Sequence, residues 1–143
     1  MADRQQVLFV CTGNYYRSRY AEHVFNHYAA GSPWQADSRG FEPSPLNPGP
    51  INATAAQRLA AAGMAPPQFR DPIRINQADL EQANLIIMLD EQEHRPYMHE
   101  RFPDWENRVR YWQIADLWAM TTDQALSAID REVQQLWAEL QQK

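Results

Sequence analysis

The sequence contains one cysteine, Cys11, among 143 residues. A single cysteine excludes a disulfide within the chain and any zinc site built from several thiolates. We expect the chain in the cytoplasm, where a lone thiol stays reduced. Scarcity thus makes Cys11 the residue that most needs an explanation.

Two further absences restrict the partners that we expect. The 13 lysines and arginines are outnumbered by 18 aspartates and glutamates, and the net charge is −5. Nucleic-acid binding needs a basic surface, so we expect no nucleic-acid partner. No apolar run approaches the roughly 20 residues of a membrane helix. The polar N-terminus leads only into the short run Val7–Val10, which is too short for a secretory signal, and we expect no membrane contact.

The composition that remains is ordinary for a globular protein, with 44% hydrophobic and 22% charged residues. The length suits one compact domain that can bury a substantial core. We therefore expect residues 1–143 to form a single domain.

Short strand-like segments alternate with segments of helical periodicity. Val7–Val10 and Leu85–Leu89 are continuous apolar runs, typical of strands buried on both faces. The alternation favours an α/β fold, a mostly parallel sheet with helices on both faces. The other predicted strands cover residues 34–38 and 109–114, and the predicted helices cover 18–29, 53–62, 77–83, a segment after Asp90 and a final segment capped by Thr121 or Thr122.

The segment that follows the first predicted strand reads Cys11-Thr12-Gly13-Asn14-Tyr15-Tyr16-Arg17-Ser18. Ligands of parallel sheets bind beyond the carboxyl ends of the strands. Glycine and asparagine accept positive φ most easily, so this loop can turn successive backbone N–H groups inward around an anion. The following helix adds its free N–H groups, and Arg17 adds a planar fork for two phosphate oxygens. The sequence predicts a phosphate-binding loop formed by Thr12, Gly13, Asn14, Tyr15, Tyr16 and Arg17.

Cys11 lies at the start of this positively polarised loop. Helix N-termini and nearby cations favour the thiolate, and Ser18 can donate a hydroxyl hydrogen bond to the sulfur. A thiolate beneath a bound phosphoryl group is placed for in-line attack, with the N–H groups and Arg17 stabilising the transition state. A lone cysteine at a strand end is often just a small buried hydrophobe. The agreement of strand, loop, Arg-Ser pair and helix favours a catalytic nucleophile.

At these residues the chain resembles the low-molecular-weight protein tyrosine phosphatase family, whose pattern is Cys-x-Gly-Asn-x-x-Arg-Ser. Ala21-Glu22, Asp37-Ser38 and Met88–Glu91 are similar to its first helix, second strand, and third strand with turn. The resemblance implies a four-stranded parallel sheet, no metal and no organic cofactor. It also implies that Cys11 attacks a phosphomonoester to form a phosphocysteine. The implied partner is a phosphotyrosine-containing protein or a small aryl phosphate.

The family also uses a late aspartate as general acid, and by position this is Asp116. The proline that usually follows it is replaced by Leu117. The residues support the same choice, because a general acid must reach the cleft from another strand's carboxyl end, and Asp116 follows the predicted fourth strand. Capping a turn is the alternative role. Trp118 takes the place of a substrate-facing aromatic and can stack on a phenyl ring or pack in the core.

Three departures from the family pattern carry consequences. Tyr16 replaces the second cysteine of many members, so a protective disulfide with Cys11 is impossible. Cys11 should therefore over-oxidise more readily, or need an external thiol. Some relatives that act on phosphoarginine have a small β-branched residue where this chain has Tyr15, which argues against that substrate. Tyr15 and Tyr16 either narrow the pocket or pack inward. Arg19 replaces a common proline, and we expect it to add positive charge near the mouth.

Two other functions stay open. The chain could be a phosphate- or phosphopeptide-binding module without turnover, or an arsenate reductase that relies on an external thiol, because one cysteine cannot pass a disulfide along.

His23 and His27 are four residues apart on a predicted helix, but no third ligand is suggested, so we expect an exposed helix face and no metal site. We also expect His94 and His99 to be exposed. The sequence does not indicate an oligomeric state.

Overall fold

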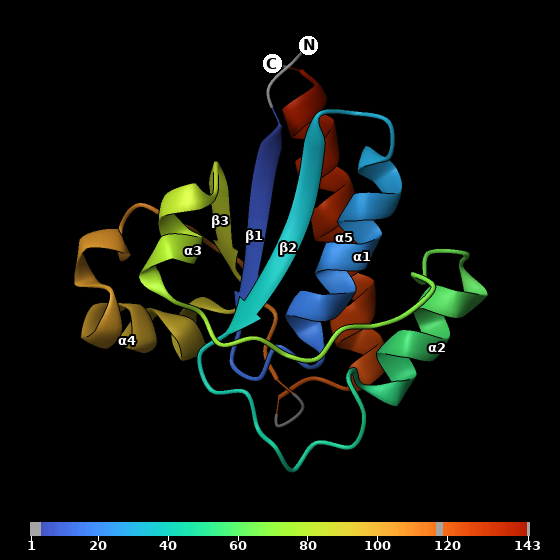
Figure 1. The fold of residues 1–143 in the computed structure, drawn as a ribbon, viewed down its shortest axis with the longest axis horizontal. Coiled ribbons are helices and arrows are strands. Elements are labelled where there is room, and N and C mark those ends of the chain that lie inside the picture. Colours follow the sequence, from blue (N-terminus) through green and yellow to red (C-terminus); the bar gives the residue numbers. More distant parts are fainter. Residues whose placement is uncertain (1–3, 117–118, 143) are drawn as a thin grey trace.

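The computed structural model describes residues 4–116 and 119–142 and contains a four-stranded sheet between two layers of helices (Figure 1). The predicted α/β fold is confirmed. The strands are β1 (Gln5–Cys11), β2 (Trp34–Gly40), β3 (Leu85–Met88) and β4 (Arg110–Tyr111). The helices are α1 (Arg17–Ala29), α2 (Ala53–Ala61), α3 (Gln77–Gln82), α4 (Glu91–Arg101) and α5 (Thr122–Gln141), with a 3₁₀ turn at Pro103–Trp105.

The sheet is parallel throughout, in the order β2-β1-β3-β4. β1 pairs along its whole length with β2, from Gln5 opposite Trp34 to Cys11 opposite Gly40. β4 is much shorter than the predicted strand over residues 109–114. The reason is its partner: β3 ends at Met88, which pairs with Tyr111, and the chain then turns into α4.

Successive residues of β1 point to opposite faces of the sheet, which explains why its apolar run is continuous. Val7, Phe9 and Cys11 pack into a core shared with α1 and α5. Leu8 and Val10 pack into a second core with residues of α3 and α4. Figure 1 shows these helix pairs on opposite sides of the sheet. The side chain of Cys11 therefore faces the side occupied by α1.

Local signals define where two of the helices begin. In α5 the apolar stripe is buried against the sheet, and Thr121 and Gln124 form a capping box. In α3 the side chain of Asn76 accepts from the backbone N–H of Asp79, which completes a second capping box. Within the described residues, no helix is both long and apolar enough to cross a membrane. The buried stripe residues of α5 are Leu126, Ile129, Val133, Leu136 and Leu140.

The stability of the fold should depend on the seam that α5 forms with α1 and the sheet. We predict that Ile129→Ala, at a fully buried position, lowers the free energy of unfolding by about 2–5 kcal/mol, because it removes apolar contacts and leaves a cavity. Urea denaturation followed by circular dichroism measures the change. Gln135→Ala, on the exposed face of the same helix, should stay within about 0.5 kcal/mol of wild type. Equal losses in the two variants would contradict this account of the seam.

Candidate active site

The loop between β1 and α1 turns at one residue. Asn14 has φ of +50°, and it is the one non-glycine residue of the described chain with positive φ. Gly13, the other residue expected to help, is not among the glycines with positive φ. α1 begins directly afterwards at Arg17, and its N-cap Tyr16 provides no side-chain cap. The first N–H groups of α1 therefore keep no partner from the N-cap side chain and face the loop end of the helix.

The Asn14 side chain orders the hydroxyl groups around Cys11. Its amide nitrogen donates to Ser18 Oγ and to Ser38 Oγ, each at 2.9 Å. Because Ser18 Oγ accepts from Asn14, its own hydrogen is available for Cys11 Sγ, which lies 2.9 Å away. A hydroxyl that donates to sulfur favours the thiolate. Ser18 thus lies where the sequence analysis expected it.

The same asparagine is held from the other side by Arg70. The Asn14 amide oxygen accepts from Arg70 Nη1 at 3.1 Å and from the backbone N–H of Ile73 at 2.9 Å. Arg70 also pairs with Glu22 at 3.2 Å and with Asp37 at 3.1 Å. Burial raises the pKa of Glu22, and the hydrogen bond from Ser38 and the charge of Arg70 partly offset this effect. The turn residue is therefore tied to β2, α1 and the segment that precedes α3.

A second support is the absence of a side chain at Gly40, which lies opposite Cys11 at the end of β2. A Cβ at this position would lie 2.7 Å from the backbone N of Asn14 and 2.7 Å from the carbonyl oxygen of Thr12. Real Cβ atoms do not approach other atoms so closely, so only glycine fits under this loop. Gly40 is not among the site residues predicted from the sequence, because nothing local distinguishes it from a turn glycine.

Arg17 lies almost completely buried beside the loop, with 2% of its surface exposed. Its Nη1 donates to the carbonyl oxygen of Ile114 and its Nη2 to Glu93 Oε2, both at 2.8 Å. Nη2 also lies 3.6 Å from Asp116 Oδ2. Burial alone would lower the pKa of Arg17, but Cys11 and Glu93 raise it overall, so the guanidinium stays charged. The structure thus brings the predicted fork and the predicted acid together.

Cys11, Arg17 and Asp116 line one pocket of about 230 Å³. Asp116 follows the β4 segment, and its side chain is 40% exposed. Trp118, the proposed aromatic partner of the substrate, lies outside the described residues. The remaining lining residues are Gly13, Tyr15, Tyr16, Asn47 and Asn52.

The two loop tyrosines separate into different roles. Tyr15 lines the pocket, and its hydroxyl donates to the carbonyl oxygen of Pro48 at 2.6 Å, which fixes the ring against the loop that precedes α2. Tyr16 is only 7% exposed, and its hydroxyl reaches the Thr122 carbonyl at 3.4 Å. Burial raises the pKa of Tyr16. Tyr15 therefore narrows the pocket, whereas most of Tyr16 packs inward toward α5.

The expectation that Arg19 adds positive charge near the mouth of the pocket is wrong, because Arg19 is fully buried. Its guanidinium donates to three carbonyl oxygens, those of Asn14 at 3.3 Å, Pro50 at 2.9 Å and Arg70 at 2.6 Å. Desolvation, together with the charge of Arg70, lowers the pKa of Arg19 to about 10. Arg19 therefore joins the phosphate loop to the two segments beside it.

The histidine predictions are wrong in two places. His94 is fully buried, since it shares a face of α4 with the buried Met98, an i, i+4 signal that was present in the sequence. His23 is partly buried against the Phe69 ring, at 5.3 Å between centroids, and burial lowers its pKa to about 4. His27 and His99 are exposed, as expected. Within the described ranges, no three acidic, histidine or cysteine side chains are grouped to hold a metal.

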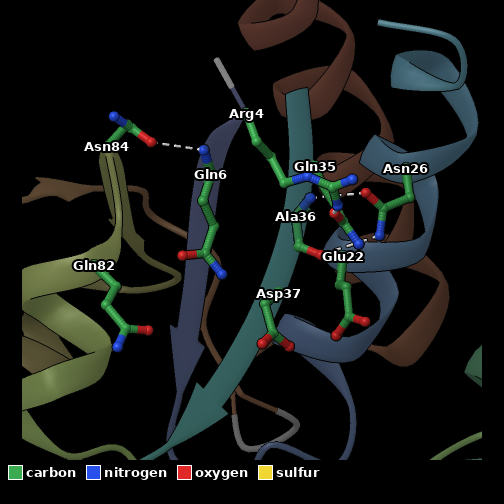
Figure 2. A pocket seen from close by; sticks show the side chains of 9 residues that line it. All are labelled: Arg4, Gln6, Glu22, Asn26, Gln35, Ala36, Asp37, Gln82 and Asn84. Atoms are coloured by element: carbon green, nitrogen blue, oxygen red, sulfur yellow. Dashed lines mark hydrogen bonds between the residues drawn. The ribbon is translucent and has the colours of Figure 1, made fainter. Parts of the chain in front are cut away.

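A larger hollow lies elsewhere, beside β1 and β2 (Figure 2). It has a volume of about 460 Å³ and is lined mainly by amide and charged side chains. Figure 2 shows Glu22 and Asp37 on its wall, the two carboxylates that also pair with Arg70. None of the described residues that line it is a cysteine, serine or histidine, so its lining offers no thiol, hydroxyl or imidazole group to compare with Cys11.

Comparisons with known proteins agree with this geometry. The family model described as low molecular weight phosphotyrosine protein phosphatase matches residues 6–143. No curated protein matches the chain. Among solved structures, the low molecular weight protein tyrosine phosphatase SP-PTP of Streptococcus pyogenes has 20% identity and a TM-score of 0.80, and covers 95% of this chain and 93% of its own.

Two further structures are similarly close. Wzb of Vibrio vulnificus in complex with benzylphosphonate has 20% identity and a TM-score of 0.77, with 95% of this chain and 98% of that chain covered. The YwlE arginine phosphatase of Geobacillus stearothermophilus has 19% identity and a TM-score of 0.78, with 96% of this chain and 94% of that chain covered. At such identities these structures establish the shared fold.

The fold and the family model together define the class of this protein as a cysteine-dependent phosphatase. The chain belongs to the low molecular weight phosphotyrosine protein phosphatase family, since the family model covers nearly its whole length.

The close approach at Gly40 generates a prediction. Gly40→Ala should displace the phosphate loop, because the added methyl would meet backbone atoms of Thr12 and Asn14 at 2.7 Å. We expect a loss of about 1–3 kcal/mol in stability and a marked loss of phosphatase activity. Gly63→Ala adds the same atom where nothing lies within 4 Å. It should cost about 1–2 kcal/mol, through its φ of +73°, and leave kcat/KM unchanged. Normal activity in Gly40→Ala would refute the steric argument.

Proposed function

We propose that this phosphatase hydrolyses aryl phosphomonoesters, with phosphotyrosine in proteins as the substrate class, through a phosphocysteine on Cys11. One observation carries the proposal: Cys11, Arg17 and Asp116 line the same small pocket at the carboxyl edge of the sheet. A nucleophile, an oxyanion-binding cation and a proton donor are the three groups that this chemistry requires.

In the first step the Cys11 thiolate attacks phosphorus in line with the leaving oxygen. The S–P bond forms as the bond from phosphorus to the phenolic oxygen breaks, and Asp116 gives its proton to that oxygen. Arg17 and the N–H groups at the start of α1 stabilise the charge on the equatorial oxygens. Ser18 supports the thiolate through the 2.9 Å contact described above.

In the second step water attacks the phosphocysteine. Asp116, now ionised, accepts a proton from the water, and the S–P bond breaks to release inorganic phosphate and the Cys11 thiolate. The same carboxyl group therefore acts as acid and then as base. Its 40% exposure leaves it accessible to the water that this step consumes.

The preference for an aryl phosphate is supported by Tyr15. Its ring narrows the pocket and is fixed by the Pro48 carbonyl, so it offers a flat wall to a phenyl ring. The Vibrio vulnificus protein was solved with benzylphosphonate, in which one methylene links a phenyl ring to a phosphonate group. The arginine phosphatase YwlE shares the fold, so phosphoarginine is the substrate to test against phosphotyrosine.

The catalytic roles can be separated with two variants. Cys11→Ser should abolish turnover of an aryl phosphate, and Asp116→Asn should slow it by about 10²- to 10⁴-fold, because the leaving oxygen loses its proton donor. The slowing should shrink on 2,4-dinitrophenyl phosphate, whose strongly acidic phenol leaves without a proton. Steady-state and single-turnover kinetics measure both effects.

Asp123→Asn is a matched control for Asp116→Asn, since Asp123 is an exposed aspartate near the start of α5. It should keep wild-type rates. Retained turnover in Cys11→Ser, or an equal effect of Asp116→Asn on both leaving groups, would assign the nucleophile or the acid elsewhere.

Substrate preference is tested with peptides that differ only in their phosphorylated residue. We expect the highest kcat/KM on phosphotyrosine, a much lower value on phosphoarginine and the lowest on phosphoserine, since neither competitor presents a phenyl ring to Tyr15. Tyr15→Val should narrow the gap between phosphotyrosine and phosphoarginine. Phosphoarginine as the best substrate of wild type would overturn the proposed class.

A further inference from the structure

Three donors from different parts of the chain converge on one carboxylate oxygen beside the proposed phosphate site. Glu93 Oε2 accepts from Arg17 Nη2 at 2.8 Å and from the hydroxyl of Thr12. His94 Nε2 lies 3.1 Å from the same oxygen. Glu93 is in the first turn of α4, whereas Thr12 and Arg17 belong to the loop and its helix. The contact thus joins the two sides of the sheet at its carboxyl edge.

A backbone hydrogen bond fixes which ring nitrogen of His94 carries the proton. The N–H of Asp90 donates to His94 Nδ1 at 3.1 Å, so this nitrogen has no hydrogen and the neutral ring carries its proton on Nε2. Full burial lowers the pKa of His94 and keeps the ring neutral, although Glu93 acts in the opposite direction. His94 is therefore a neutral donor, whose Nε2 lies 3.1 Å from both the Thr12 hydroxyl oxygen and Glu93 Oε2, and not a second cation.

The partners of Glu93 keep it ionised. Its side chain is 18% exposed, and burial alone would raise its pKa. Hydrogen bonds from His94, Arg17 and Thr12 outweigh burial and hold the pKa of Glu93 well below its usual range. An ionised carboxylate paired with a buried guanidinium makes a strong, directional contact.

The geometry points to Glu93 as the residue that positions Arg17 for the phosphoryl group, an inference that rests on the function proposed above. An arginine has five N–H donors. The carbonyl of Ile114 takes one from Nη1 and Glu93 takes one from Nη2, which fixes the plane of the guanidinium from two directions. This leaves the other N–H groups of Arg17, in one fixed plane, to bind the oxyanion of the substrate.

The charge of Glu93 also acts against phosphate binding, so the direction in which phosphate affinity changes when that charge is removed shows which effect dominates. A carboxylate beside Arg17 neutralises part of the charge that attracts a phosphate dianion, and it competes for the same N–H groups. If competition dominated, removal of the charge from Glu93 would tighten phosphate binding. If positioning dominates, the same change weakens phosphate binding and slows turnover.

The test is the affinity of Glu93→Gln for inorganic phosphate, measured by isothermal titration calorimetry, which does not depend on turnover. We expect Kd to rise by about 10- to 100-fold, the effect of one hydrogen bond between charged groups, and kcat on an aryl phosphate to fall as well. Glu91→Gln is the matched control: it removes the same charge from the same helical turn, where Glu91 pairs with Arg95 and Gln113. It should bind phosphate as wild type does.

A double-mutant cycle distinguishes positioning from a general loss of structure. In an Arg17→Lys background, Glu93→Gln should cause little further loss of phosphate affinity, because a lysine presents no fork to orient. Additive losses, or unchanged or tighter phosphate binding in Glu93→Gln alone, would overturn the inference. If Glu93→Gln does not fold, Thr12→Val removes one donor to the same oxygen, and the same criteria apply with a smaller expected rise in Kd.

The two proposals fail in different ways. Wild-type protein that binds phosphate in a Glu93-dependent manner but hydrolyses no phosphomonoester would end the proposed function and leave the assignment of Glu93 standing. Turnover through Cys11 in a protein whose phosphate affinity does not depend on Glu93 would support the proposed function and end the assignment of Glu93.

Discussion

The site depends first on the hydrogen bonds of one amide side chain. Asn14 supplies the positive φ of the loop, and its amide group holds Ser18 and Ser38 with the nitrogen and Arg70 and Ile73 with the oxygen. A left-handed residue normally costs free energy, and these bonds offset that cost. The backbone curve that surrounds the phosphate position and the hydroxyl that supports the sulfur therefore have a common origin.

Two groups of side chains from distant segments support the loop that contains Asn14. On one side of the loop, Arg70, Glu22 and Asp37 form a charged group between the loop and β2. On the other side of the loop, Glu93 and His94 of α4 reach Thr12 and Arg17. Cys11, the proposed nucleophile, is thus located by a strand, and the groups around it are located by side chains from distant segments. Such double support is what a preorganised anion site requires.

The sequence was sufficient for most helices and strands, whose signals are local. The apolar run of β1, the stripe of α5 and the Asn76 cap all predicted their elements, because periodicity and capping act over a few residues. The fourth strand was predicted too long, because its length depends on where β3 ends. Gly40, Arg70 and Glu93 were missed for a related reason: their importance lies in contacts with residues distant in sequence. Arg19 was misplaced because a buried arginine needs carbonyl partners that only the folded chain provides.

Arg19 also limits how this protein can be remodelled. Its guanidinium is shared among the carbonyls of Asn14, Pro50 and Arg70, so the loop before α2 and the segment before α3 have a common anchor under the nucleophile loop. A proline at this position has no side-chain donor, and all three oxygens would need new partners. Exchanging either of these segments alone with that of a relative would therefore disturb the hydrogen bonds of the other. A chimaera that keeps the pocket intact must carry over all three stretches of chain together, or redesign the buried cation at its centre.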